Sequence, residues 1–529
     1  MAVTANKPRP RCAKAGPHSQ AALGGALSVF MAMAFAMPAH ARDWLFEPGV
    51  GASATYSDNA NQSATNPQDA LILSVTPGFI LRSQGSRRVR ASVSYGLTGV
   101  ARFSDENSTD VNHHLSATGT AELIEDFLFI DGNASISQEL ISLLDSPADA
   151  EINDSNRATV GTYSISPYIK KRLGTFANAQ ARYTTGGAIF ENDVASDSSV
   201  HSLTAGLTSG TQFNDLNWGL NYSIRKANNR DVADTTFERA SATVGYALTR
   251  KFRVFGAVGD EWNDYPSITD IDGTFWSAGF GWSPSRRTSV EASMGERFFG
   301  RTYSFSGSHR TRLSRWTVRY SEDISDITQQ YLEASSRIFW VCNGTTLFET
   351  PDINPPAGQS SCVGPITAGQ LALLFIISGV STSDLIAAGL LNVASANGTY
   401  VIKSLSGGVS WSLSKLNFGL SVFDTTRIYQ ILANTEDRTQ GITASVGYRL
   451  APNTSVNGSL GLTRNEVPAT LSGGTDREDN LYTLTLGMNH QFASKLSGAL
   501  IFRHTQRDSN VADADYEENR LTASVNMRF

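Results

Sequence analysis

The chain has 529 residues, of which 17% are charged and 40% hydrophobic, and its formal net charge is −6. Soluble globular proteins carry about 25% charged residues, so the low share favours one large membrane barrel, whose lipid-facing and lumen-facing residues alternate, over several soluble domains. The chain has no basic domain, which argues against nucleic acid as a partner.

Residues 1–41 have the features of a secretory signal peptide. The first 14 positions hold four basic residues, and an apolar run of roughly 17 residues follows at 21–37. Pro38-Ala39-His40-Ala41 then supplies an A-x-A cleavage site before Arg42. We therefore expect a mature chain of 42–529, with an uncleaved anchor as the alternative.

Segments of alternating apolar and polar residues fill most of the mature chain. Alternation with period two predicts strands with one apolar and one polar face. Most segments have about 11–14 residues, enough to cross a bilayer at a tilt. The expected strands are 46–57, 69–82, 88–103, 112–124, 127–138, 159–172, 175–186, 200–212, 216–227, 236–248, 252–263, 273–283, 288–299, 302–313, 316–325, 399–412, 416–427, 438–449, 454–465, 479–491, 495–507 and 517–529.

The polar faces of these segments are rich in Ser, Thr, Asn and Gly, as in Asn217, Gly219, Asn221 and Ser223. Such residues suit a wall that lines water, whereas an exposed face of a soluble sandwich would carry more Lys and Glu. We predict an all-β, antiparallel, up-and-down transmembrane β-barrel of about 22 strands, with 20 to 24 as the range. A soluble propeller is the architectural alternative.

Connections between the segments alternate in length. Short ones such as 125–126 and 173–174 alternate with long ones such as 139–158 and 466–478. Outer-membrane barrels have short periplasmic turns and long outer loops, so both termini are expected in the periplasm. Aromatic residues near strand ends resemble two interfacial girdles: Tyr56, Phe103, Phe127, Phe176, Phe190, Phe252, Tyr265, Trp282, Trp316, Trp411 and Phe492.

The final strand ends on an aromatic residue. Leu521, Ala523, Val525, Met527 and Phe529 share one face of 521–529. A terminal Phe is common in bacterial outer-membrane barrels, where it resembles the signal read by the barrel-assembly machinery. We expect Val525, Met527 and Phe529 to serve as this signal, and the last strand to close the barrel against 46–57.

Charge is sorted between the two kinds of connection. Acids crowd the long loops, for example at Glu436, Asp437, Glu517 and Glu518. A basic periplasmic mouth would favour entry of an anionic polymer. Alternatively, these are solvated turns, and the loop acids meet divalent ions among surface lipopolysaccharide. The basic residues at the expected periplasmic mouth are Arg87, Arg88, Lys171, Arg172, Arg250, Lys251, Arg286 and Arg287.

One connection, 326–398, is far longer than the others. It is too apolar for a disordered segment, and loops of such length are usually functional. One or two short helices are expected, the first at 370–380 and the second at 384–391, and Phe339, Trp340, Leu374 and Phe375 are candidates for a constriction. The loop either folds into or over the pore as a lid, or forms an ordered extracellular cap.

Cys342 and Cys362 lie in this connection and form a candidate disulfide, because they are an even pair in an exported chain. No His lies near either cysteine, which argues against a metal site. Histidines are scattered, and no nucleophile–base or nucleotide motif is present. We expect no catalytic site, no metal and no cofactor. The first strand begins within a few residues of Arg42, which leaves no room for a plug domain ahead of the barrel.

The mature N-terminus contains Tyr56-Ser57-Asp58-Asn59 directly after the first expected strand. This resembles a family of outer-membrane proteins associated with the PEP-CTERM/exosortase system, whose first strand leads into a Tyr-x-Asp-Asn motif. The resemblance implies residence in a Gram-negative outer membrane beside exopolysaccharide biosynthesis and export loci. Read physically, Asp-Asn is an ordinary turn pair.

Three hypotheses of function follow from these observations. The first is a barrel that passes exopolysaccharide or a surface protein through a polar lumen gated by 326–398. The second is a non-conducting surface barrel whose loops bind matrix polymer, and the third is a general diffusion porin. Expected partners are outer-membrane lipid and lipopolysaccharide, the assembly machinery, and exopolysaccharide or proteins of the export locus.

Overall fold

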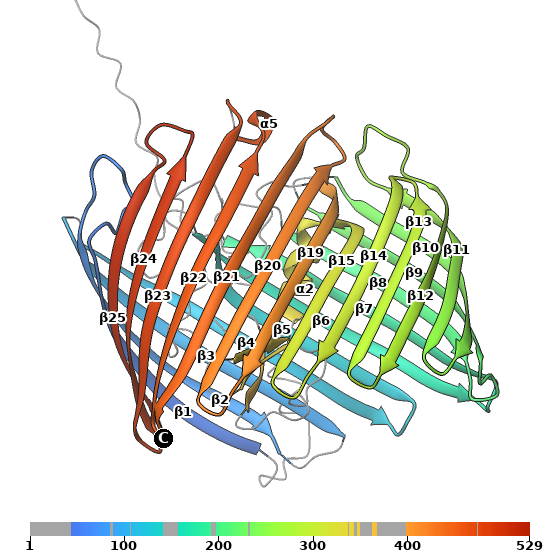
Figure 1. Cartoon of the computed structure of the whole chain (residues 1–529), viewed down its shortest axis with the longest axis horizontal. Coiled ribbons are helices and arrows are strands. Elements are labelled where there is room, and N and C mark those ends of the chain that lie inside the picture. Colours follow the sequence, from blue (N-terminus) through green and yellow to red (C-terminus); the bar gives the residue numbers. More distant parts are fainter. Residues whose placement is uncertain are drawn as a thin grey trace, which may run out of the picture.

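The computed structural model describes residues 44–84, 88–105, 107–140, 157–191, 197–230, 233–336, 338–342, 346–349, 362–367, 398–472 and 474–529. The expected signal peptide, 1–41, lies outside this range. Twenty-two strands form a single antiparallel sheet, and the sheet closes on itself because β1 (Trp44–Ser57) pairs with both β2 (Ala70–Ser83) and β25 (Tyr516–Arg528). The protein is therefore a β-barrel in which each strand pairs with its sequence neighbours (Figure 1).

Between β2 and the long connection the wall consists of β3 (Val89–Phe103), β4 (Ser108–Ile124), β5 (Leu128–Leu140), β6 (Arg157–Leu173), β7 (Ala177–Phe190), β8 (Ser198–Ser209), β9 (Leu216–Asn229), β10 (Thr235–Thr249), β11 (Phe252–Asp264), β12 (Gly273–Ser285), β13 (Thr288–Arg297), β14 (Gly300–Arg310) and β15 (Ser314–Asp326). After that connection it continues with β19 (Thr399–Ser412), β20 (Leu416–Tyr429), β21 (Glu436–Ala451), β22 (Thr454–Val467), β23 (Arg477–Ala493) and β24 (Leu496–Ser509).

Every expected strand has a counterpart in the barrel, so the predicted fold class is confirmed. The differences lie mostly at the ends that meet the long loops: β4 begins at Ser108, β21 at Glu436 and β23 at Arg477. Polar and charged residues occupy both faces there, which hides the alternation. The strands pair beyond the point where the sequence stops looking amphipathic.

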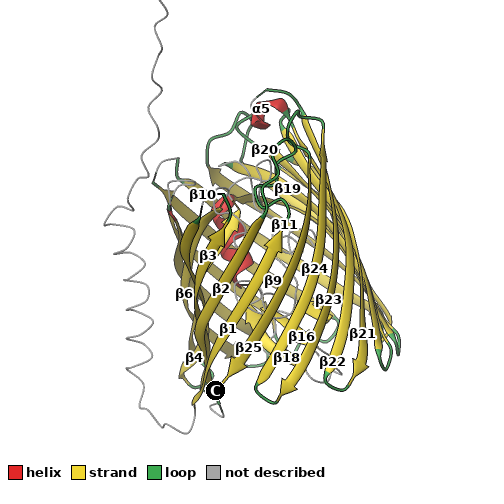
Figure 2. Ribbon diagram, turned by 90° about the vertical axis from the view of Figure 1, so that its left-hand side faces the viewer, coloured by secondary structure: helices red, strands yellow, loops and turns green. Residues whose placement is uncertain are grey.

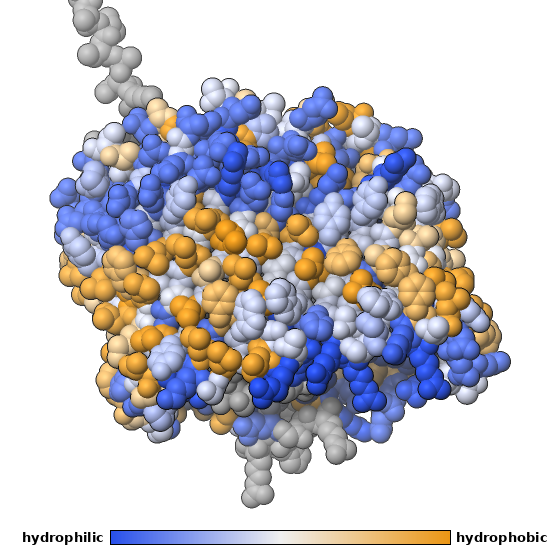
Figure 3. Space-filling view, in the orientation of Figure 1, coloured by the Kyte–Doolittle hydropathy of each residue, from blue (hydrophilic) through white to orange (hydrophobic). Residues whose placement is uncertain are grey.

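The two faces of the wall differ as the alternation predicted. Val244, Leu248 and Leu450 are each at least 55% exposed, on the outer face. Figure 3 shows a broad apolar band across the middle of one face of the molecule, with hydrophilic surface above it and below part of it. Facing inward, Thr55, Ser74 and other small polar residues are buried. The barrel thus has an apolar outside and a polar lumen.

Connection lengths define the two ends of the barrel. At the short-turn end the links are brief, as between β10 and β11 or β12 and β13. At the loop end they are longer, and α5 (Ala469–Ser472) lies in one of them, above the strands (Figure 1). One loop-end link is short, because only Phe298 and Phe299 separate β13 from β14.

The long connection adds a helix and a small sheet. Helix α2 (Ile327–Ser336) follows β15 directly, and β16 (Ile338–Cys342) pairs with both β17 (Thr346–Glu349) and β18 (Cys362–Thr367). Neither helix of the described ranges has the length and apolar run that a membrane span requires. The expected helices at 370–380 and 384–391 lie outside the described residues.

The first and last strands are joined by side chains as well as by their ladder. Asp58 accepts hydrogen bonds from the Asn519 amide (2.7 Å) and from Asn519 Nδ2 (2.9 Å). Asn59 Nδ2 donates to the Glu517 carbonyl (2.8 Å), and Phe529 N–H donates to Pro48 O at 2.9 Å. The expected closing pair is confirmed, and Asp58 and Asn59 belong to its loop end.

Replacing Asp58 and Asn59 together with Ala is expected to weaken this seam. Hydrogen bonds to a charged group contribute about 1.5–3 kcal/mol and neutral ones about 1 kcal/mol, so we expect a loss of about 3 kcal/mol. The temperature at which the folded band converts to the unfolded band on heated gels should fall. Asp69→Ala, an exposed change in the same loop, is the control and should leave that temperature unchanged.

Candidate functional site

The segment after β15 turns into the barrel. Helix α2 packs against β5, β6 and β7 as well as against β15, and Figures 1 and 2 both draw it inside the wall. β15 lies far from β5–β7 around the sheet, so the helix bridges separate parts of the lumen wall. Helix α2, the described start of 326–398, therefore lies inside the lumen.

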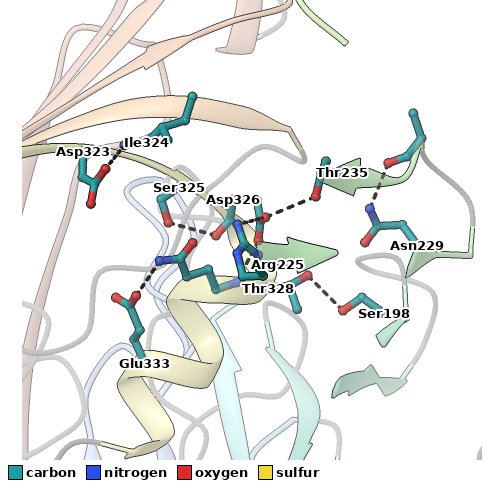
Figure 4. A network of polar contacts seen from close by, with 12 residues as sticks. Ser198, Arg225, Asn229, Thr235, Asp323, Ile324, Ser325, Asp326, Thr328 and Glu333 are labelled. Atoms are coloured by element: carbon teal, nitrogen blue, oxygen red, sulfur yellow. Dashed lines mark hydrogen bonds and ion pairs between the residues drawn. The ribbon is translucent and has the colours of Figure 1, made fainter. Parts of the chain in front are cut away.

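Asp326 fixes the start of this helix. Its Oδ1 accepts the Gln329 backbone N–H at 2.8 Å, the usual N-cap bond. Its Oδ2 accepts from Arg225 Nη2 on β9 (2.6 Å) and from Thr235 Oγ1 on β10 (3.4 Å). One carboxylate therefore caps α2 and ties it to two strands of the wall (Figure 4).

A second tie lies two residues further on. The hydroxyls of Thr328 and Ser198, at the start of β8, are 2.9 Å apart and both are buried. Arg225 and Asp326 are themselves mostly buried, with 17% and 8% of their side chains exposed. A buried charge left without its partner is costly, so these contacts hold α2 in one position. We call Asp326, Arg225, Thr235, Thr328 and Ser198 the α2 latch.

Further buried ion pairs line the inner wall at the loop end. Arg427 Nε and Asp437 Oδ1 are 2.8 Å apart, and Tyr429 Oη donates to Asp437 Oδ2 at 2.9 Å. Arg297 contacts both Glu261 (2.8 Å) and Asp323 (2.7 Å). Buried charges persist when they are paired in this way. The pairs join β20 to β21, and β13 to both β11 and β15, into a rim.

Two carboxylates expected in solvated loops belong to this rim instead. Asp437 lies on β21 beside Arg427, and Glu518 on β25 accepts hydrogen bonds from Ser57 (2.7 Å) and Gln62 (3.0 Å). The prediction that these acids lie in outer loops was wrong, because the strands extend beyond the apolar band and carry paired charges there.

A buried phenol lies in the loop that follows β11. Tyr265 packs against Ile324 and Val401, and burial, with a smaller contribution from the Glu261 carboxylate, raises the pKa of Tyr265 well above its usual range. The group stays neutral at physiological pH. Tyr265 and Phe190 are both buried, so neither belongs to an outer aromatic girdle as the sequence suggested. Phe492 and Trp282 are exposed near the short-turn end, as expected.

Hydroxyl groups cover much of the remaining lumen wall. Pairs on neighbouring strands bond directly to each other, at 2.6 to 3.0 Å. The pairs are Ser53 with Ser74, Thr55 with Thr522, Thr76 with Thr98, Ser135 with Thr162, and Ser166 with Thr184. These hydroxyl pairs make the wall polar and uncharged where they lie, beside the ion pairs described above.

The basic residues expected at the periplasmic mouth lie at the short-turn end, except Arg87, which is outside the described residues. The side chain of Arg88 is 64% exposed and pairs with Glu125 at 3.0 Å. Lys171, Arg172, Arg250, Lys251, Arg286 and Arg287 are also exposed. No described contact joins them into one binding site.

The constriction candidates are only partly described. Phe339 and Trp340 lie on β16, and both views place its small sheet within the outline of the barrel (Figures 1 and 2). Leu374 and Phe375 lie outside the described residues. The register pairs Cys342 with Cys362 directly across β16 and β18. Opposed residues in antiparallel strands have Cα atoms about 4.5–5.5 Å apart, a separation that a disulfide can bridge.

We accordingly expect Cys342 and Cys362 to be joined in the exported protein. Denatured protein should take up two maleimide groups only after reduction, and each single Cys→Ser variant should take up one without reduction. Uptake of two groups before reduction would contradict the bridge.

The latch residues were not singled out from the sequence. Asp326-x-x-Gln329 has the spacing of a capping box and could have marked the start of α2. Arg225 sits on a predicted polar face, but nothing in the sequence links it to Asp326. Among the described residues no group of three or more His, Cys, Asp and Glu side chains is arranged to hold a metal ion.

Comparison with known proteins gives similarity in structure only. No family model and no curated protein matches the chain. The siderophore receptor PirA from Pseudomonas aeruginosa is similar at 10% identity, covering 92% of this chain and 80% of its own, with a TM-score of 0.44. The FrpB iron transporter from Neisseria meningitidis (F5-1 variant) is similar at 10% identity, covering 91% of this chain and 82% of its own, with a TM-score of 0.47. A loop-deletion mutant of OmpT, an outer membrane protein of Vibrio cholerae, is similar at 9% identity, covering 92% of this chain and 99% of its own, with a TM-score of 0.30. No conclusion about function follows from similarities of this size.

Proposed function

We propose that this protein is a gated pore of a Gram-negative outer membrane, and that the segment beginning at Asp326 is its gate. The observation that carries the proposal is the position of α2, which lies in the lumen and is held there by the α2 latch. A structural barrel has no need of a helix pinned across its interior.

Membrane placement rests on two features of the fold. A closed barrel satisfies every backbone group without an exposed edge, which a bilayer demands of any spanning sheet. An apolar band crosses the face of the outer wall that Figure 3 shows, as in transmembrane barrels. With the short-turn end in the periplasm, Val525, Met527 and Phe529 lie where the barrel-assembly machinery operates, and the loop end meets lipopolysaccharide.

We further propose exopolysaccharide as the cargo. Paired hydroxyls line the wall on β25, β1–β3 and β5–β7, and hydroxyl groups can exchange hydrogen bonds with a sugar polymer. The Tyr56-x-Asp58-Asn59 resemblance supports the same cargo. A general diffusion porin and a non-conducting surface barrel are the two alternatives.

Three measurements test this function. The protein should fractionate with outer membranes and show heat-modifiable migration on gels; recovery as a soluble periplasmic protein would refute membrane placement. In planar bilayers the intact protein should conduct only weakly. A deletion strain should lose secreted polymer, whereas normal secretion together with channel activity would favour the diffusion porin.

A further inference from the structure

The outer face of the barrel carries an apolar groove over β6 to β11, with a volume of about 650 Å³. Its floor is made of small side chains, from Ala179, Ala181, Ala205 and Ala242, and larger ones such as Leu220 rise beside them. Most of a barrel's outer wall is covered by larger apolar residues, so a run of alanines leaves a trough facing the membrane.

The groove runs across the strands along one hydrogen-bonded row. In order this row is Lys171, Ala179, Leu207, Leu220, Ala242 and Val258. Five steps at about 4.8 Å each give a length of about 24 Å. Lys171 lies two residues before the end of β6, whereas Val258 lies six residues after the start of β11. The groove therefore climbs from the short-turn end toward mid-barrel.

This slope matches one leaflet of a membrane. With strands tilted by about 40°, a 24 Å row rises about 15 Å, which is half of a hydrocarbon core of about 30 Å. A fatty-acyl chain anchored at the short-turn end would reach the bilayer centre where the groove ends.

The charges at the two ends of the groove are opposite. Lys171 is exposed at the lower end, where its nearest described partner is the Phe127 ring, 5.8 Å from Nζ, and no described carboxylate pairs with it. At the upper end Tyr222 donates to Glu238 (2.8 Å), and Asp260 lies opposite Ala240. An anionic headgroup is therefore attracted to the lower end of the groove, at Lys171, and repelled from the upper end, near Glu238 and Asp260.

We propose that this groove binds one anionic phospholipid of the periplasmic leaflet, with its phosphate at Lys171 and an acyl chain along the alanine floor. The groove lies in the half of the wall nearer the short-turn end, so the phosphates of lipopolysaccharide, in the opposite leaflet, would not reach Lys171. The site is separate from the lumen and requires only the membrane placement proposed above.

Native mass spectrometry of the whole protein, released from vesicles of phosphatidylglycerol or of phosphatidylcholine, tests the proposal. We expect one retained phosphatidylglycerol per barrel and little phosphatidylcholine. Lys171→Gln should reduce retention of phosphatidylglycerol about fivefold, as expected for one lysine at a membrane surface. It should leave the retention of phosphatidylcholine unchanged.

The double variant Ala205→Leu, Ala242→Leu fills the floor of the groove and should abolish retention of phosphatidylglycerol. Ala444→Leu, on the outer face of β21 and away from the groove, should leave that retention unchanged. Both variants should keep heat-modifiable migration, which shows that they fold. The proposal is overturned if no lipid is retained, if the filled groove retains it equally, or if the groove instead joins two barrels into a dimer that the filled variant cannot form.

Discussion

Removing residues 327–397 is expected to convert a weakly conducting barrel into an open channel. Barrels of 16–18 strands already leave an aqueous passage, and this one has 22. The described obstruction of its lumen is α2 with the small sheet that follows. Conductance in planar bilayers should rise by an order of magnitude or more, and cells that carry the variant should become sensitive to large antibiotics such as vancomycin.

The wall itself should survive this deletion. Asp326 and Thr399 are directly paired on β15 and β19, so a short Gly/Ser linker can join the strands as a tight hairpin. A control that replaces Ala469–Ser472, in a loop above the strands, with a linker of equal length should keep the conductance of the intact protein. If the variant lacking 327–397 migrates as a folded barrel yet passes no current, the segment 327–397 is not a gate.

Most of the wall could be predicted from the sequence because a barrel strand meets two solvents. Leu220 and Leu450 contact the outside, whereas Asn221 and Arg449, their neighbours in sequence, point to the other face. That contrast repeats along each strand and survives without knowledge of the partner strands. The closing pair could be predicted as well, because β1 and β25 are the first and last strands and an up-and-down barrel must pair them.

The gate could not be predicted in the same way. Arg225 and Asp326 are 101 residues apart in sequence, and their meeting depends on how far α2 reaches across the lumen. Helix α2 was not predicted either, because residues 327–336 are mostly polar and contain no apolar run. Asp437 looked like a loop acid because its partner Arg427 lies on the previous strand, and only the register places them together.

Replacing Asp326 with Ala should release α2 from the wall while leaving the barrel folded. The change removes the N-cap, worth about 1 kcal/mol, and leaves Arg225 buried without its partner, at a cost of about 3–5 kcal/mol. Hydrogen exchange read by mass spectrometry should report this directly. Amide protection across 327–336 should fall at least about 100-fold, the equivalent of about 3 kcal/mol, with protection in β20–β25 unchanged.

Companion variants separate the two roles of this carboxylate. Asp326→Asn keeps an N-cap acceptor and should lose less protection than Asp326→Ala. The double variant Arg225→Ala, Asp326→Ala should lose less amide protection in α2, expressed as free energy, than the sum of the two single variants, because it leaves no unpaired charge. Asp323→Ala is the matched control: the Asp323 side chain is 62% exposed, and its described contacts are with Arg297 and the Ile324 backbone N–H, not with α2, so α2 should stay protected. If protection in α2 survives loss of Asp326, the helix is held by other contacts, and the latch is not what keeps the lumen closed.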